Sequence, residues 1–304
     1  MPGAIALGAY IHDDNNYASS DPSVQDWYAN LVGRQPAISA WGTDWVHFNY
    51  FQPSTMDTFR TRGSMNLFTW MPGDKSIANG VAQPAYKLTN ITRGDFDGYI
   101  RQWATDARTW GHPFYLRFGH EMNGNWYAWS TAPGNPDGNT PADFVAAWRH
   151  VHDIFTQVGA TNVRWVWCVN TTDPSYTPYA QDYPGDNYVD WVSIDGYNWG
   201  TSHAWSKWQS LSDVFAASYA EMTALTSKPI IIGETASLEQ GGSKADWITQ
   251  GFLQTIPNSF LNIRAVVWYD DNDANGDWLI ESSSASLDAW KSVVSSPLYQ
   301  GQLH

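Results

Sequence analysis

Residues 114–121 read FYLRFGHE, a short hydrophobic run that ends in a carboxylate. Such a run is typical of a buried β-strand. The amphipathic stretch Ala142–Gln157 follows it along the chain, and the next apolar run is Val163–Asn170. This succession of strand, helix and strand predicts a βα unit of a parallel sheet.

The same alternation extends in both directions along the chain. We expect strands at Ile5–Ile11, Ile38–Trp45, Met65–Met71, Phe114–His120, Val163–Asn170, Val189–Tyr197, Pro229–Thr235 and Ile263–Tyr269. We expect helices at Ser23–Leu31, Met56–Thr61, Arg93–Trp110, Ala142–Gln157, Asp213–Leu225, Ala245–Ile256 and Ser286–Val294, and a loop in place of a helix around Tyr176–Asp190. In a chain of 304 residues this pattern predicts an α/β fold of the (β/α)8 TIM barrel type, with one catalytic domain over residues 1–304.

The composition argues against several classes of function. The chain has 16 Lys and Arg residues against 30 Asp and Glu residues, a net charge of −14, so we expect no binding to nucleic acid or to anionic membranes. A single cysteine, Cys168, rules out a disulfide framework, and its apolar strand indicates inert burial. The 19 Trp, 16 Tyr and 12 Phe residues favour a neutral ligand with flat apolar faces, such as carbohydrate.

Two glutamates each end a hydrophobic strand, Glu121 after residues 114–120 and Glu234 after residues 229–233. The carboxyl ends of the strands meet at one mouth of a barrel, so we expect these side chains to face each other. Glycoside hydrolysis requires such a pair, with one carboxyl group as proton donor and the other as an ionised nucleophile. The alternative is that both are buried partners of an ion pair, for example with Arg117.

The surroundings of the two glutamates favour different roles. Glu121 precedes the aromatic loop Met122–Trp129, which is suited to excluding water around an acid. Glu234 follows an isoleucine run and Gly233, which leave it less freedom to rotate. We therefore expect Glu121 to be the acid/base and Glu234 the nucleophile.

The stretch HEMNGNW at residues 120–126, with Arg117 ahead of it, resembles the acid/base motif of glycoside hydrolase family 26. GETAS at residues 233–237 resembles the nucleophile motif of that family, and DGYNW at residues 195–199 and Trp268 also match. The resemblance covers nearly the whole chain. It implies a retaining (β/α)8 glycosidase with the same assignment of the two glutamates.

The resemblance also implies supporting roles. Tyr197 resembles the family tyrosine that hydrogen-bonds the nucleophile, and Trp268 resembles the platform beneath the sugar at the cleavage subsite. We expect His120 to orient a catalytic carboxylate or to contact sugar, and Arg117 either to hold a carboxylate ionised or to pair with Asp195 in the barrel core. The expected substrate-binding residues are Trp126, Trp268, Asn123, Trp199 and Trp129, with Trp205 and Trp208 as further loop aromatics and Trp165, Trp167 and Trp191 as core residues.

No metal or cofactor is predicted. Asp271–Asp277 matches the start of a calcium loop, but Ser282 occupies the position of the required bidentate glutamate, so we interpret the segment as a loop of Asx turns. The expected partner is a β-linked polysaccharide or oligosaccharide, bound by a monomer. We expect a secreted protein whose signal peptide is not part of this sequence, with a cytoplasmic location as the alternative.

The substrate is predicted from departures within the family, which contains β-1,4-mannanases, mixed-linkage β-1,3-1,4-glucanases and β-1,3-xylanases. Many of its mannanases carry Trp-His at the end of the third strand, where the histidine contacts the axial hydroxyl of mannose. This chain has Trp70-Met71 there, and NWYAW at residues 125–129 in place of the common Trp-Phe-Trp-Trp. The resemblance is therefore closer to the lichenase-type β-glucanases. An endo-β-1,4-mannanase, a β-1,3-xylanase and a non-catalytic carbohydrate-binding barrel are the alternatives.

Overall fold

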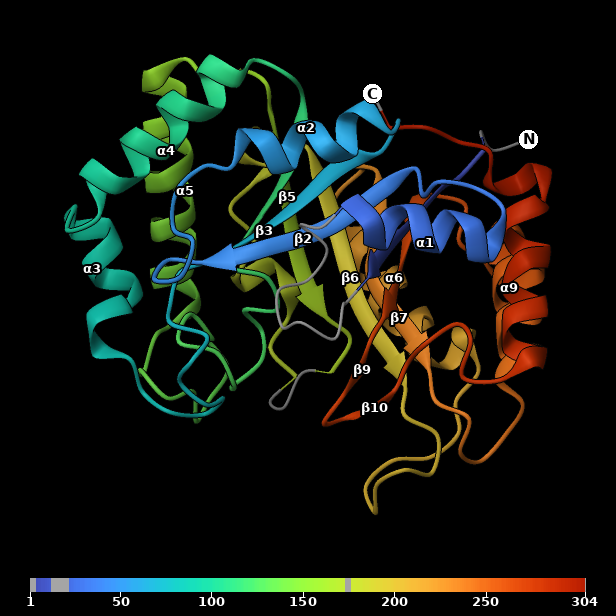
Figure 1. Ribbon diagram of the computed structural model, residues 1–304. Coiled ribbons are helices and arrows are strands. Elements are labelled where there is room, and N and C mark those ends of the chain that lie inside the picture. The colour runs from blue at the N-terminus through green and yellow to red at the C-terminus, as the bar shows by residue number, and fades with distance from the viewer. Residues whose placement is uncertain (1–3, 12–21, 173–175, 304) are drawn as a thin grey trace.

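Parallel strands close into a barrel in the order β1 to β8, with β8 paired to β1 (Figure 1). The structure is a computed structural model and describes residues 4–11, 22–172 and 176–303. The barrel strands are β1 (Ala6–Ile11), β2 (Ile38–Asp44), β3 (Met65–Met71), β4 (Phe114–Phe118), β5 (Val163–Asn170), β6 (Trp191–Asn198), β7 (Ile230–Ser237) and β8 (Ile263–Asp270). The predicted fold class and the positions of the eight strands are confirmed.

The connecting helices surround the barrel (Figure 1). They are α1 (Pro22–Val32), α2 (Pro53–Thr61), α3 (Leu88–Arg93), α4 (Asp97–Trp110), α5 (Pro141–Val158), α6 (Leu211–Leu225), α7 (Lys244–Gln250), α8 (Ile256–Ser259) and α9 (Ser284–Ser295). Short 3-10 turns occupy Pro84–Tyr86, Tyr179–Gln181, Asp186–Tyr188 and Pro297–Tyr299. The fifth connection therefore has no α-helix among its described residues, as predicted. None of the described helices is both long and apolar enough to span a bilayer.

Two predicted helices are interrupted. The single helix expected over Arg93–Trp110 is wrong because Gly94 has φ +96° and ends α3 with a left-handed cap before α4 begins. The helix expected over Ala245–Ile256 breaks into α7, a π-helical turn at Gly251–Thr255 and α8. Hydrophobic periodicity is compatible with both interruptions, so it did not reveal them.

The buried side chains form two clusters, one on each face of the barrel wall. The smaller cluster fills the barrel interior and includes Ile38, Leu67, Val166, Ile231 and Val267. The larger cluster lies between the strands and the helices and includes the α5 stripe Phe144, Ala147, Trp148, Val151 and Ile154. Because successive strand residues alternate between these faces, a shift of one position moves a side chain from the barrel interior to the helix layer.

Candidate active site

A cleft of about 560 Å³ opens at the carboxyl ends of the strands. This is the end of a (β/α)8 barrel at which functional groups converge. Side chains from the ends of most strands and from the loops after them line the cleft, among them Tyr10, Met71, Lys75, Arg117, His120, Glu121, Trp126, Asn170, Tyr197, Trp199, Trp205, Glu234, Tyr269 and Trp278. Both predicted glutamates therefore lie in one open site.

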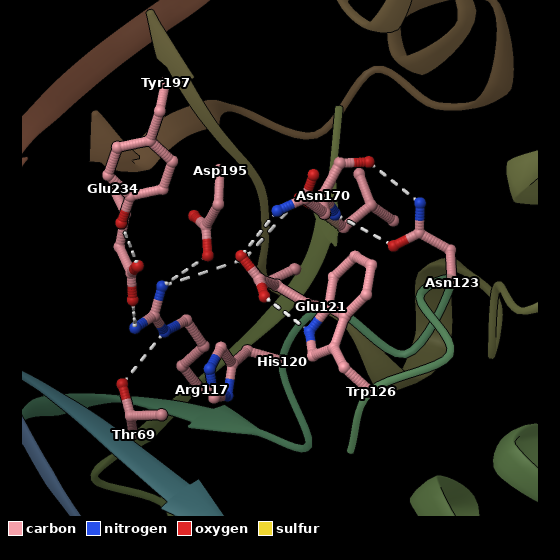
Figure 2. Close-up of polar contacts among 12 residues, drawn as sticks. Thr69, Arg117, His120, Glu121, Asn123, Trp126, Asn170, Asp195, Tyr197 and Glu234 are labelled. Carbon is pink, nitrogen blue, oxygen red and sulfur yellow. Dashed lines mark hydrogen bonds and ion pairs between the residues drawn. The ribbon is translucent and has the colours of Figure 1, made fainter. Parts of the chain in front are cut away.

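Glu121 and Glu234 approach each other from opposite sides of the cleft, with Arg117 and Asp195 between them (Figure 2). One carboxylate oxygen from each of Glu121, Asp195 and Glu234 lies within 4.8 Å of the other two. The facing pair predicted from the strand ends is therefore present.

Glu121 lies beyond the regular part of the strand that it was expected to end. Strand β4 ends at Phe118, Gly119 has φ +52° and Glu121 has φ +54°. A left-handed conformation at a residue other than glycine costs on the order of 1–3 kcal/mol and is frequent at functional sites. The Glu121 amide donates to the carbonyl of Cys168 at 2.9 Å, which anchors this turn to β5.

The carboxylate of Glu121 is buried and hydrogen-bonded at both oxygens. Asn170 donates to Oε1 at 2.7 Å, and the Trp126 indole donates to Oε2 at 3.1 Å (Figure 2). Burial, and next the negative charge of Glu234, raise the pKa of Glu121 to about 7. A carboxyl group with this pKa is able to hold a proton near neutral pH and to release it.

Glu234 is on β7 and its side chain is 16% exposed, which leaves it accessible from the cleft. The Tyr197 hydroxyl donates to Oε2 at 2.5 Å, and the Arg117 guanidinium pairs with Oε1. Charge-assisted bonds of this kind suit an ionised carboxylate with a fixed orientation.

Arg117 makes the contacts of both roles considered for it, the contact with a glutamate of the cleft and the ion pair with Asp195 in the barrel core. Its Nη1 pairs with Asp195 on β6 at 2.9 Å, its Nη2 pairs with Glu234, and its Nε donates to Thr69 on β3 at 2.9 Å. The guanidinium is therefore a buried core ion pair and a partner of the accessible glutamate at once.

His120 lines the cleft beside Glu121. Burial lowers its pKa well below the usual value, and the positive charges of Arg117 and Lys75 act in the same direction. The ring is therefore neutral, and its Nδ1 has no hydrogen-bond partner among the described residues. It packs at 5.0 Å from the ring of Tyr127.

Three of the predicted substrate-binding residues lie outside the cleft. Trp268 is completely buried and points into the helix layer, where it packs 4.9 Å from Trp290 and donates to the carbonyl of Trp278. The prediction of a sugar platform at Trp268 is wrong because alternation along β8 turns Tyr269, and not Trp268, toward the barrel mouth. Trp278, from the segment after β8, also lines the cleft.

Trp129 and Asn123 are likewise buried, so neither contacts a ligand in the cleft. The indole of Trp129 donates to the carbonyl of His120, and its ring stacks on Tyr127 at 4.5 Å. The side chain of Asn123 accepts from the Asn170 amide at 2.9 Å and donates to the Asn170 carbonyl at 2.8 Å. The binding role predicted for both is wrong, because their polar groups are used in shaping the loop after β4.

Other aromatic predictions have mixed outcomes. Trp126 and Trp199 line the cleft as expected. Trp165 and Trp167 are buried, and Trp191 is partly buried against the barrel core. Cys168 is fully buried in the barrel interior, and burial raises the pKa of its thiol well above the usual value.

Several cleft residues were not predicted. Asn170 is the last residue of a strand whose end was located correctly, so its position was available as a signal. Tyr10 and Tyr269 also lie at strand ends, and their rings stack at 4.8 Å across the β1 and β8 pair. Lys75 lies in the loop after β3 with its ammonium 4.8 Å from the Tyr127 ring, and no pattern in that loop marked it.

Two groups of side chains among the described residues have the donor set for a metal ion. In the group of Glu121, Asp195 and Glu234, the Arg117 guanidinium already supplies the positive charge. In the group of Asp44, His47 and Asp74, the Asp44 carboxylate accepts from the amides of Val46 and Lys75.

The segment Asp271–Asp277, predicted as a loop of Asx turns, contains the hairpin of β9 (Asn272–Asp273) and β10 (Gly276–Asp277). Asp273 accepts from the amides of Asn275 and Gly276, which is an Asx turn.

Comparison with known proteins agrees with this architecture. The model of glycosyl hydrolase family 26 matches residues 67–269. Endoglucanase H of Acetivibrio thermocellus is 40% identical over 292 residues, covering 95% of this chain and 30% of that protein. Mannan endo-1,4-beta-mannosidase A and B of Caldalkalibacillus mannanilyticus is 30% identical over 154 residues, covering 50% of this chain and 27% of that protein. The chain thus spans less than a third of these relatives.

Solved structures share the fold at low sequence identity. A modular endo-β-1,4-mannanase from Cellulomonas fimi superposes with a TM-score of 0.70 at 16% identity, covering 97% of this chain and 71% of that one. The family match extends from β3 to β8 and includes both glutamates of the cleft. The chain therefore belongs to glycosyl hydrolase family 26, a family of O-glycosidases.

Proposed function

We propose that the protein is a retaining endo-β-glycanase that acts through a glycosyl-enzyme intermediate. The observation that carries this proposal is that a carboxylate oxygen of Glu121 lies within 4.8 Å of one of Glu234 in an open cleft. Carboxyl groups in retaining glycosidases are about 5–5.5 Å apart, whereas inverting enzymes need about 6.5–9.5 Å to admit a water molecule. Oxygens this close leave little room for a water molecule between the two groups, which favours direct attack by a carboxylate.

In the first step, a carboxylate oxygen of Glu234 attacks the anomeric carbon of the sugar. Glu121 gives its proton to the glycosidic oxygen as the bond to the leaving sugar breaks. In the second step, ionised Glu121 takes a proton from water, the water oxygen bonds to the anomeric carbon, and Glu234 departs as a carboxylate. The two inversions give net retention of configuration.

The neighbours of each glutamate support these roles. Arg117 and Tyr197 direct both oxygens of Glu234, which leaves a carboxylate in a fixed position for attack. Burial and the charge of Glu234 raise the pKa of Glu121 to about 7, so Glu121 is protonated before the first step. Once Glu234 is esterified its charge is lost, and Glu121 becomes more acidic and is ready to act as a base.

For the substrate we infer a mixed-linkage β-1,3-1,4-glucan. Support comes from the 40% identity to a protein named Endoglucanase H. It also comes from Met71, a cleft residue at the position where many mannanases of the family have histidine. A thioether cannot donate a hydrogen bond to the axial hydroxyl of mannose. The second candidate is β-1,4-mannan, supported by the 30% identity to a mannosidase.

A substrate screen tests this order. We expect the protein to release new reducing ends from barley β-glucan faster than from galactomannan, with β-1,3-xylan slower than either. Activity on galactomannan alone would reverse the order of the first two substrates. Binding to all three polysaccharides without any release of reducing ends would instead indicate a non-catalytic carbohydrate-binding barrel.

The nucleophile is tested separately with Glu234→Ala. We expect turnover of β-glucan to fall by several orders of magnitude because no covalent intermediate can form. Azide, a small external nucleophile, should restore cleavage of an activated aryl β-glycoside and give the α-glycosyl azide. Glu221→Ala, on α6 and away from the cleft, serves as the control and should keep wild-type turnover. Wild-type turnover by a folded Glu234→Ala variant would contradict the assignment.

We further infer that residues 1–304 form one catalytic domain and that the protein is secreted and acts as a monomer. Barrel strands from β1 to β8 with α9 behind them support a single unit, and an extracellular location suits an enzyme for a polymeric substrate. Light scattering of the purified chain tests the monomer, and a mass of two or more chains would contradict it.

A further inference from the structure

Trp205 is an exposed aromatic side chain at the rim of the cleft. It lies in the loop between β6 and α6, which extends beyond the strand ends in Figure 1, and it is 70% exposed. Its indole also lines the same cleft as the two glutamates. A tryptophan this exposed leaves a large apolar face in water, where it is available to a ligand with an apolar face of its own.

The loop holds this indole in a defined position. The ring of Trp205 packs at 5.3 Å edge-on against Trp199 and at 5.0 Å against His203. Within the same loop, the amide of His203 donates to the Ser206 hydroxyl at 3.1 Å, and the amide of Thr201 donates to the carbonyl of Gln240 at 3.0 Å. The platform is therefore preorganised, and binding a ligand there does not require the loop to become ordered.

A series of aromatic rings connects this platform to the catalytic centre. Tyr197, which donates to Glu234, lies 6.2 Å from Trp199, and Trp199 in turn lies 5.3 Å from Trp205. Trp199 therefore stands between Trp205 and the tyrosine that contacts Glu234. Asp273 and Asn275, from the β9 and β10 hairpin, line the same cleft and present polar groups to it.

We propose that Trp205 forms a distal subsite that binds a glycosyl unit of the polysaccharide outside the cleavage subsite. The indole face stacks on the C–H groups of the pyranose, and the hairpin residues bond its hydroxyls. A β-linked glucosyl unit suits this platform because its hydroxyls are equatorial and both of its ring faces are apolar. The inference rests on the proposed function, because it extends the substrate along the same cleft.

If Trp205 forms a distal subsite, the decrease in kcat/KM caused by Trp205→Ala depends on the length of the substrate. For barley β-glucan and for the longest oligosaccharides of a mixed-linkage series, we expect kcat/KM to fall up to about tenfold, mainly through KM. For oligosaccharides too short to reach the platform, kcat/KM should equal that of the wild type. Trp205→Phe should restore most of the activity on long substrates. Trp27→Ala, which removes a 45% exposed tryptophan on α1, is the matched control and should change neither value.

An equal loss at every length, or no loss on the longest substrates, would overturn the subsite. A binding measurement distinguishes failure of the subsite from failure of the proposed hydrolase function. Calorimetry with a mixed-linkage hexasaccharide on Glu234→Ala, with and without Trp205→Ala, reports the platform without turnover. Weaker binding in the double variant supports the subsite, and equal binding contradicts it. The wild-type substrate screen alone decides whether the protein hydrolyses the glucan.

Discussion

At the scale of single residues, the proton of Glu121 is controlled by opposing contacts. Burial and the charge of Glu234 favour the protonated form, whereas the hydrogen bonds donated by Asn170 and Trp126 favour the ionised form. The resulting pKa of about 7 lies where one carboxyl group can act as acid and then as base. Residues that only touch Glu121 therefore affect the reaction through its pKa.

The pH dependence of kcat/KM should show the ionisation of Glu121 directly. The first step requires protonated Glu121, so kcat/KM should decrease as pH rises through about 7. The profile is measured on β-glucan at constant ionic strength. Glu121→Ala, assayed on an activated aryl β-glycoside that needs no proton donor, should lack this basic limb. A basic limb that persists in Glu121→Ala would assign it to another group.

Asn170→Ala should move the basic limb to higher pH. The variant loses the 2.7 Å hydrogen bond to Oε1, which favours ionised Glu121, so the pKa of Glu121 should rise. We expect kcat at the optimum to fall about 10- to 150-fold, since a hydrogen bond to a charged group contributes about 1.5–3 kcal/mol. Asn258→Ala, an exposed position on α8, is the control. An unchanged limb would mean that Asn170 has only a structural role.

At the scale of helices and strands, local sequence patterns define the first turns of α5 and α6. Thr140 and Asp143 form a reciprocal capping box at the start of α5, and Ser210 and Asp213 form another at α6. The helix α5 follows the loop that carries Glu121 and packs against the barrel core through its apolar stripe. Its first turn therefore supports the end of the site loop.

Thr140→Ala should destabilise the fold by about 1 kcal/mol because the amide of Asp143 loses its side-chain acceptor. Equilibrium denaturation with urea measures the difference. Thr156→Ala, on the exposed side of the same helix, removes only a bond to the His152 carbonyl and should change stability by less than about 0.5 kcal/mol. Equal losses in the two variants would contradict a capping role.

Strand alternation explains some of the site predictions, and local departures from it explain the others. Tyr197 was located correctly because alternation along β6 carries it to the same face as Asp195. Glu234 faces the cleft because the register of β7 shifts at Gly233, so that Ile194 pairs with Ile232 but Asp195 pairs with Glu234. The platform role of Trp268 came from the family resemblance, whereas in β8 it is the neighbouring Tyr269 that faces the cleft. Glu121 reaches the cleft only through the left-handed turn after β4, which the residue pattern does not encode.

At the scale of the whole molecule, the order of elements was predictable because each βα unit carries its own local signal. The loops were not predictable in this way. Asn123 is buried through a bond to Asn170 on β5, 47 residues away, and Trp129 through a bond to the His120 carbonyl in the irregular turn after β4. Arg117 is a single side chain that connects several strands of the barrel. It links β4 to β3, β6 and β7 through Thr69, Asp195 and Glu234.

Arg117→Met should destabilise the barrel by about 3–5 kcal/mol because Asp195 is left buried without its positive partner. The free energy of unfolding is measured in guanidinium chloride. Arg117→Lys keeps a charge in the core and should lose less. Arg101→Met, an exposed arginine on α4, should stay within about 0.5 kcal/mol of the wild type. A loss below about 1 kcal/mol in Arg117→Met would show that the ion pair does not support the fold.

Cys168 is the single cysteine of the chain, and its thiol is enclosed by the barrel. An alkylating reagent can reach this sulfur only when the strands separate. The rate of thiol labelling therefore measures how often the barrel opens, and the measurement needs no engineered probe. An oligosaccharide that binds only the closed barrel should slow labelling by a factor of one plus the ratio of its free concentration to its Kd, so the same reaction reports ligand affinity even for variants that have lost turnover.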